Sequence, residues 1–195
     1  MSKNNLLKRD LLEKDLSKRD LNKLADYSLS TADMKRGVPD AKFVIYSDVH
    51  KYKSIDDLIG KTGKCYILYL IQNEHYGHWV CLFKRGNKLF YSNSYGIQPD
   101  DDMLFVKNPN LKVKVNEDEP YLFMLIAKSK YQCDYNPYPI QNDKAKTCGR
   151  HCIFRLWNTH LDSDKYYKLL KDLSKKTGLE YDEIVTYYTS KAIGK

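Results

Sequence analysis

The fold is decided by residues 78–92, which read HWVCLFKRGNKLFYS. Two apolar runs flank the turn-forming residues Lys84-Arg85-Gly86-Asn87, so the stretch predicts an antiparallel hairpin. The two-residue loop is either Arg85-Gly86 or Gly86-Asn87. A loop at Arg85-Gly86 places His78 directly opposite Asn93. A loop at Gly86-Asn87 places His78 opposite Tyr95, with Asn93 as a diagonal neighbour on the same face. In both registers the Asn93 side chain reaches an imidazole nitrogen, which suits either the orientation of a catalytic base or an ordinary surface pair.

The segments around this hairpin predict a central sheet with helices before and after it. Residues 65–71 form a continuous apolar run, as in a buried central strand, and further strands are expected at 42–47, 112–115 and 121–127. Residues 30–33, Ser-Thr-Ala-Asp, have the pattern of a capping-box-like helix start. Further helices are expected at 54–59, from Cys148 onward, at 163–177 before Gly178, and at 181–192. This order predicts an α+β fold with a central mixed β-sheet flanked by helices.

The length of 195 residues predicts one domain with an extension, since a domain takes about 150 residues. Residues 1–28 are the predicted extension, a charged helix in which Leu alternates with Lys, Arg and Asp, and residues 29–195 are the predicted single domain. No run approaches the ~18 apolar residues of a membrane span, and the N-terminus does not have the pattern of a signal peptide. Five Cys without an export signal favour a reducing compartment over a disulfide framework.

The net charge of +8 is compatible with two interpretations. A positive surplus favours contact with nucleic acid, acidic proteins or anionic surfaces, and it also serves solubility alone. The cations are dispersed along the chain, without an Arg-rich arm or a zinc-finger spacing.

A second group of polar residues lies around Cys148, at the expected start of a helix. The free N–H groups and positive dipole end of a helix N-terminus stabilise a thiolate, so a lowered pKa is expected for the Cys148 thiol. Gly149 allows another part of the backbone to approach closely. The side-chain amide of Gln141 and the N–H of Cys148 are candidate donors to an oxyanion. Taken alone, each of these residues also has an ordinary structural interpretation.

As a set, these residues resemble the adenain-type cysteine proteases. The resemblance is carried by His78-Trp79, Tyr91-Ser92-Asn93-Ser94-Tyr95-Gly96, Ile140-Gln141 and Thr147-Cys148-Gly149-Arg150-His151-Cys152, and it extends from about Leu29 to Cys152. That family comprises the maturation proteases of adenoviruses, with relatives in virophages, polinton-like elements and large DNA viruses, and the SUMO-deconjugating proteases share its pattern.

The resemblance implies a role for each matching residue. His78 corresponds to the general base, Cys148 to the nucleophile and Gln141 to the residue that shapes the oxyanion hole. Trp79 and Gly149 correspond to residues near the substrate. The implied fold is that of adenain, with the catalytic Cys at the N-terminus of a central helix.

Asn93 takes the third position of the triad, where the family more often has an acidic residue. An amide orients the imidazole by hydrogen bonding but offers no full charge to an imidazolium. Asn93→Asp is therefore expected to retain or raise activity. Residues 100–102, three Asp in a predicted loop, are poorer candidates for the third position.

No cofactor and no metal are expected. The spacing of Cys148, His151, Cys152 and His160 fits no usual zinc pattern. Adenain works near packaged DNA, so by analogy DNA is left open as a partner, and DNA or a peptide as an activator.

The sequence predicts a cysteine endopeptidase, a viral or virophage maturation protease that cleaves capsid or core precursor proteins next to small residues such as Gly. Its expected partners are these precursors and not membranes, and its expected places are the host-cell cytoplasm or nucleus and the virion. Three alternatives remain: an isopeptidase of ubiquitin-like modifiers, an acyltransferase that would need an acetyl-CoA site, and an inactive DNA- or capsid-binding scaffold.

Overall fold

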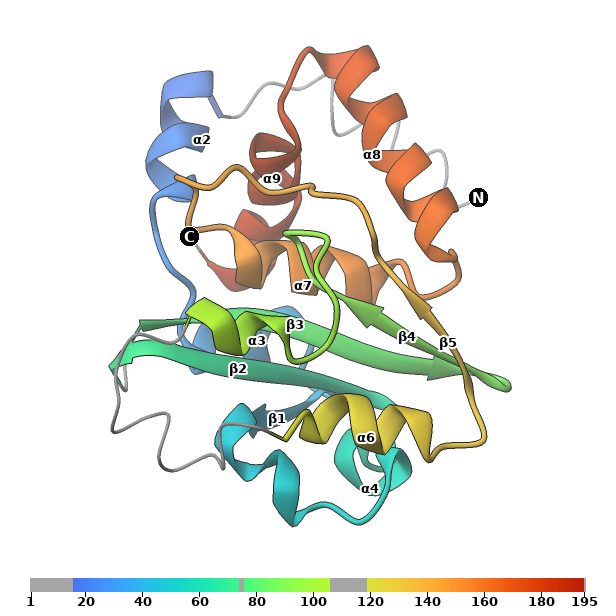
Figure 1. The fold of residues 1–195 in the computed structure, drawn as a ribbon. Helices are drawn as coiled ribbons and strands as arrows, with labels where there is room; N and C mark the ends of the chain where they lie inside the picture. The colour runs from blue at the N-terminus through green and yellow to red at the C-terminus, as the bar shows by residue number, and fades with distance from the viewer. Residues whose placement is uncertain (1–15, 74–75, 106–118, 195) are drawn as a thin grey trace.

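The protein is described by a computed structural model that covers residues 16–73, 76–105 and 119–194. At its centre lies one sheet of five strands, which are adjacent in chain order (Figure 1). The strands are β1 (Lys42–Ile45), β2 (Lys64–Asn73), β3 (Tyr76–Arg85), β4 (Lys88–Ser92) and β5 (Gln132–Tyr135). The two edge strands run parallel to their neighbours and the inner pairings are antiparallel, so the predicted α+β fold with a mixed sheet is confirmed.

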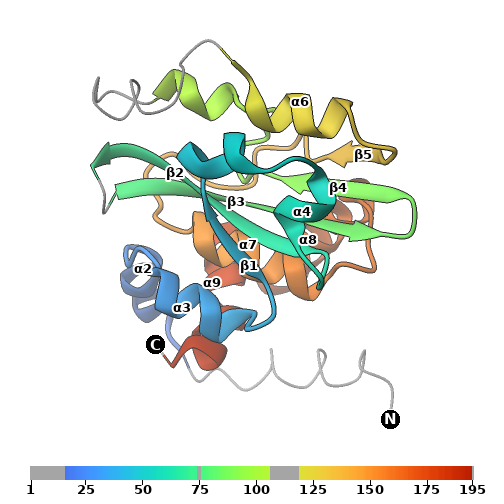
Figure 2. The same cartoon turned by 90° about the horizontal axis from the view of Figure 1, so that it is seen from below.

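Helices cover both faces of this sheet (Figures 1 and 2). Helices α4 and α6 lie on one face, and α7 and α9 lie on the other. The helical segments are α2 (Lys18–Ala25), α3 (Thr31–Gly37), η1 (Tyr46–Lys51), α4 (Ile55–Ile59), η2 (Asp101–Phe105), α6 (Tyr121–Ala127), α7 (Cys148–Trp157), α8 (Ser163–Thr177) and α9 (Tyr181–Ile193).

The central hairpin has the second of the two predicted registers. Cys81 pairs with Ser92 and Arg85 with Lys88, so Gly86-Asn87 is the loop, and Gly86 has a positive φ of 60°. Continued beyond Ser92, this register brings Tyr95 opposite His78, and the two rings stack with their centroids 4.7 Å apart.

Two sequence expectations are corrected by the structure. Residues 121–127 form helix α6 and not a strand, because Leu122 and Ile126, four residues apart, are the side chains buried against the sheet. A short apolar run is compatible with both structures, and here the packing decides between them. Strand β5 was not predicted, since its polar sequence QCDY belongs to a sheet edge and lacks an apolar pattern. The strand expected at 112–115 lies outside the described residues.

Local signals set the helix boundaries where the sequence predicted them. Ser30 and Asp33 form the capping box at the start of α3. Ser54 caps α4, which ends at Gly60, and α8 ends at Gly178 in the left-handed conformation.

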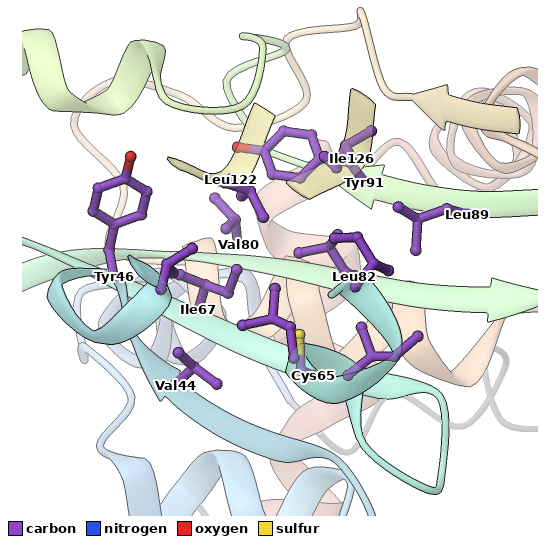
Figure 3. Close-up of a cluster of buried hydrophobic side chains, with 14 of the residues drawn as sticks. Val44, Tyr46, Cys65, Ile67, Val80, Leu82, Leu89, Tyr91, Leu122 and Ile126 are labelled. Carbon is purple, nitrogen blue, oxygen red and sulfur yellow. The ribbon is translucent and has the colours of Figure 1, made fainter. Parts of the chain in front are cut away.

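Three hydrophobic clusters hold the layers together. The first fills the sheet face under α4 and α6 (Figure 3) and includes Val44, Ile67, Val80, Leu82 and Leu122. The second joins the opposite face to α3 and α7 through Trp79, Cys81, Phe83, Met34 and Ile153. The third lies between α7, α8 and α9 and includes Phe154, Tyr166, Leu170, Ile184 and Val185.

Helix α7 is therefore enclosed on both sides, and every residue from Gly149 to Leu156 is buried. Its two arginines have structural partners. Arg150 donates to Thr189, Ser190 and the Leu24 carbonyl, and the Arg155 guanidinium lies 4.6 Å from the ring centroid of Phe83. Two of the cations in the net positive charge thus belong to the core.

The described part of the predicted N-terminal extension packs onto this core. Leu21 and Ala25 of α2 are buried, α2 lies against α9, and Lys18 pairs with Glu183 at 3.7 Å. Residues 1–15 of the extension lie outside the described residues. Across the described ranges, no helix is long and apolar enough to cross a membrane.

Leu122→Ala should lower the free energy of unfolding by roughly 2–5 kcal/mol, because it leaves a cavity under a fully buried helix face. Leu104→Ala is the matched control, since Leu104 is 82% exposed and its loss should change stability by no more than about 0.5 kcal/mol. Urea unfolding of both variants measures the difference. Equal stabilities would contradict the packing of α6 on the sheet.

Candidate active site

Four segments of the chain bring the predicted site residues together. His78 lies in β3, Asn93 follows β4 directly, Gln141 lies between β5 and α7, and Cys148 is the first residue of α7. His78, Gln141 and Cys148 line one cavity of about 110 Å³, together with Gly77, Tyr95 and residues of the 143–146 segment. Asn93 is buried behind His78.

The hydrogen bonds around Asn93 define the tautomer of His78. The Asn93 Oδ1 atom lies 2.9 Å from His78 Nε2 and accepts the Tyr95 backbone N–H at 3.0 Å. Because the N–H of Tyr95 needs an acceptor, the amide oxygen and not the nitrogen faces the imidazole. Nε2 is therefore the protonated nitrogen of neutral His78, and Nδ1 keeps its lone pair.

A carboxylate that the sequence analysis ranked low lies behind this pair. Asp102, in η2, accepts from Asn93 Nδ2 at 2.7 Å and from the Tyr91 hydroxyl at 3.4 Å, and its Oδ1 lies 3.8 Å from His78 Nε2. Asp102 is 1% exposed. A run of three Asp in a predicted loop does not reveal which of them turns inward, so this contact was not visible in the sequence.

The other two carboxylates of the run have different surroundings. Asp101 is exposed. Asp100, which has a positive φ of 74°, accepts the backbone N–H groups of Leu122 and Phe123 at the start of α6 and the Tyr46 hydroxyl. Only Asp102 of the three therefore belongs to the candidate site.

The expected low pKa of Cys148 is wrong for the structure as it stands. Burial raises the pKa of the Cys148 thiol to about 11, although backbone hydrogen bonds with Trp79, Gly149 and Cys148 itself act in the opposite direction. Burial also lowers the pKa of His78 to about 4, against the hydrogen bond with Asn93. Both shifts favour a neutral thiol and a neutral imidazole at rest, because desolvation outweighs the helix N-terminus.

The Gln141 side chain is held by hydrogen bonds at both ends. Its Oε1 accepts the Ser94 hydroxyl at 2.6 Å, and its Nε2 donates to the Ala145 carbonyl at 2.7 Å and to the Tyr95 hydroxyl at 3.2 Å. The amide donor lies at the cavity that contains Cys148. An oxyanion that accepts a hydrogen bond from Gln141 Nε2 would replace either the Ala145 carbonyl or the Tyr95 hydroxyl as its acceptor.

The segment that carries Gln141 and Cys148 is attached to α9 through Asp182. This carboxylate accepts from the Asn142 N–H at 2.9 Å, from His151 Nε2 at 3.0 Å and from the Thr147 hydroxyl. Burial alone would raise the pKa of Asp182, but these hydrogen bonds and the charge of His151 outweigh it, and the pKa is lowered. The position of Cys148 therefore depends on a contact with a helix near the C-terminus.

Trp79 and Gly149 both lie in packing positions next to the site. Trp79 is 4% exposed and its indole N–H donates to the Leu29 carbonyl at 3.2 Å. A Cβ on Gly149 would lie 2.9 Å from Met34 Sδ and 3.1 Å from Leu29 Cβ. The close approach at Gly149 is made by side chains of Leu29 and Met34 and not by another part of the backbone, as was expected. The substrate-binding roles of both residues stay predictions.

Two of the residues considered for a metal, His151 and Cys152, have other contacts. Cys152 is buried and its thiol lies 3.4 Å from the Trp79 carbonyl oxygen, and His151 pairs with Asp182. In the part of the chain that the structure describes, no three or more His, Cys, Asp or Glu side chains are grouped so that they could hold a metal ion.

Comparison with known proteins links the chain to a virophage. No protein-family model matches the sequence. The chain is 36% identical over 152 residues to the uncharacterized protein V9 of Sputnik virophage, a match that covers 76% of this chain and 86% of V9. The chain belongs to the family of V9. The name of V9 states no activity, so the chemistry follows from the site alone.

Alkylation of Cys148 by iodoacetamide should be slow at pH 7 and should rise about tenfold per pH unit through pH 9, because only the thiolate reacts. Mass spectrometry of the Cys148 peptide after timed labelling measures this rate. The same peptide in urea-unfolded protein is the control, and its rate should level off above the ordinary thiol pKa of about 8.5. A rate in the folded protein that is already constant below pH 8 would reveal a preformed thiolate.

Proposed function

We propose that the protein is a cysteine endopeptidase of the adenain type, which cleaves structural precursor proteins of a virus or virophage. The observation that carries this proposal is the single cavity lined by His78, Gln141 and Cys148, with Asn93 hydrogen-bonded to the imidazole. These residues come from four separate segments and have the types and order of a thiol-dependent acyl-transfer site. Homology to a virophage protein supports the viral setting.

The proposed reaction begins from the neutral pair. His78 Nδ1 takes the proton of the Cys148 thiol as the sulfur forms a bond to the peptide carbonyl carbon. The carbonyl oxygen becomes an oxyanion that accepts hydrogen bonds from Gln141 Nε2 and the Cys148 N–H. When the C–N bond breaks, the His78 imidazolium gives its proton to the leaving amine. A water molecule, deprotonated by His78, then hydrolyses the thioester and restores the thiol.

The size of the cavity supports cleavage next to small residues such as Gly. Its volume of about 110 Å³ lies below the ~300 Å³ at which ordinary ligand pockets begin, and Gly77 forms part of its wall. A more open groove of about 600 Å³ adjoins this cavity, and Gln141, Lys144 and Ala145 line both. Its volume is large enough for further substrate residues. Capsid or core precursors in the host-cell cytoplasm, in the nucleus or in the virion are the proposed substrates, and DNA or a peptide is the proposed class of activator.

An inactive DNA- or capsid-binding scaffold is the second candidate, and a specific observation favours it. The raised pKa of Cys148 and the lowered pKa of His78 disfavour a thiolate–imidazolium pair at rest. In addition, the amide donor of Gln141 already binds the Ala145 carbonyl. The peptidase proposal requires the proton to move only during attack and the Gln141 amide to exchange its acceptor.

Co-expression with the structural proteins of the same virus should generate new protein termini, which mass spectrometry identifies. Cys148→Ala should lower their formation by about a thousandfold or more, because it removes the nucleophile. Cys133→Ala is the matched control and should leave the termini unchanged, since Cys133 lies on β5 away from the cavity lining. Termini that persist with Cys148→Ala would end the peptidase assignment, and no termini with the wild-type chain would favour the scaffold.

An isopeptidase would use the same cavity, so a different probe separates it from an endopeptidase. A ubiquitin-like protein with a C-terminal vinyl sulfone labels the nucleophile of such enzymes. Rapid labelling of Cys148 by this probe, without cleavage of the structural proteins, would move the assignment to an isopeptidase.

A further inference from the structure

One buried carboxylate at the site has no role in the reaction described above. Asp102 accepts hydrogen bonds from Asn93 and Tyr91. Among the described residues, the basic group that lies near its carboxylate is His78, whose Nε2 is 3.8 Å from Asp102 Oδ1. A carboxylate buried without an Arg or Lys partner is unfavourable for folding, and such groups concentrate at functional sites.

The contact with Asp102 acts together with the Tyr95 N–H to determine which way the Asn93 amide points. A flipped amide would present its Nδ2 hydrogens to His78 and to the Tyr95 N–H, and its Oδ1 to the Asp102 carboxylate. The contacts with Tyr95 and Asp102 would then be unfavourable, because donor would face donor at Tyr95 and acceptor would face acceptor at Asp102. The observed orientation satisfies Tyr95, Asp102 and His78 together.

We propose that Asp102 is a positioning residue of this site. By accepting the Asn93 amide N–H, it fixes the amide oxygen toward His78 Nε2 and so selects the tautomer that leaves Nδ1 free to take the thiol proton. The site then works as a relay of four residues, Asp102–Asn93–His78–Cys148, in which a negative charge acts on the imidazole through an amide. This inference deepens the proposed peptidase function and rests on it.

The electrostatic surroundings of Asp102 make its ionised form unfavourable, which supports a functional and not a stabilising role for this carboxylate. Burial raises the pKa of Asp102 to about 7, the charges of Asp101 and Asp100 add to this, and hydrogen bonds from Tyr91 and Asn93 act against it. The titratable and charged groups that face it from the surrounding elements are Tyr46, Tyr69, His78, Tyr91, Asp100, Asp101, Cys148 and Cys152.

The sign of the linkage follows from this raised pKa. Between the unfolded pKa of 3.8 and about 7, the folded chain binds more protons than the unfolded chain, so Asp102 makes the protein less stable as the pH rises. The Tm of Asp102→Asn should therefore exceed that of the wild type at pH 8, and the difference should shrink toward pH 4. A merely structural residue would give the opposite result, a loss of stability.

Asp102 also changes the expectation for Asn93→Asp. The new carboxylate would lie against the carboxylate of Asp102, and two such groups in contact cannot both be ionised in a buried site. The single variant should therefore lose activity at pH 8, contrary to the expectation from sequence. In the single variant the proton shared by the two carboxyl groups weakens the acceptor that faces His78. The exchange variant Asn93→Asp with Asp102→Asn carries an unshared charge next to His78 and should recover activity relative to Asn93→Asp.

Two readouts test the proposal on the full chain. The first is kcat and KM for the peptide that the wild-type chain cleaves fastest in a proteome-derived peptide library. The second is the ¹⁵N NMR spectrum of the His78 ring, which reports the tautomer without any turnover. Asp102→Ala should lower kcat roughly a hundredfold with KM nearly unchanged, and should shift the ring away from the Nε2–H form. Asp101→Asn removes a neighbouring, exposed charge and should behave like the wild type in both readouts.

The outcomes separate this proposal from the proposed function. If the wild type cleaves peptides and Asp102→Ala keeps both kcat and the His78 tautomer, the positioning role is wrong while the peptidase stands. If the wild type cleaves nothing, the peptidase is wrong, and the NMR comparison alone decides whether Asp102 orients His78. Should Asp102→Ala fail to fold, Asp102→Leu, which also lacks an acceptor for Asn93 Nδ2, and the exchange variant carry the test.

Discussion

The structure depends on the burial of helix α7 between two layers. The sheet contacts one side of this helix and the helices α8 and α9 contact the other, so that every residue from Gly149 to Leu156 is buried. A helix held on both sides cannot rotate or slide without opening voids in a core packed as densely as a crystal. Cys148, its first residue, therefore has a defined position relative to β3. The end of β3 that carries His78, the turn after β4 that carries Tyr95 and the start of α7 meet at one cavity for this reason.

The same burial sets the chemistry of the site. Water is largely excluded around His78, Asn93 and Asp102, so each polar atom there needs a partner from the chain. The result is a continuous set of hydrogen bonds from Asp102 through Asn93 to the imidazole. Desolvation also keeps the thiol and the imidazole neutral, whereas a more open site would favour the charged pair. The burial that fixes the positions of these side chains thus also disfavours a charged thiolate and a charged imidazolium.

Two loops far apart in the sequence complete this arrangement. Asn136 donates to the Asn93 carbonyl at 2.8 Å and to the Tyr138 carbonyl at 3.0 Å, which ties the segment after β5 to the turn after β4. Gly96 allows this contact, because a Cβ there would lie 2.7–2.9 Å from backbone atoms of residues 137–139, and its φ is +71°. Asp182 attaches the next part of the same segment to α9. The geometry of the candidate site therefore depends on contacts between several distant segments and not only on its four named residues.

The sequence by itself determined the features that depend on neighbours along the chain. The presence of a hairpin turn within Lys84–Asn87, the helix starts at Ser30 and Ser54, the helix end at Gly178 and the order of the site residues are all of this kind, because propensity and capping act over a few residues. Only the tertiary structure decided whether residues 121–127 form a helix or a strand, which of the three Asp turns inward, and in which direction burial shifts the pKa of the Cys148 thiol. These outcomes depend on contacts between distant segments and on loss of water, and neither quantity is contained in a local pattern of residues.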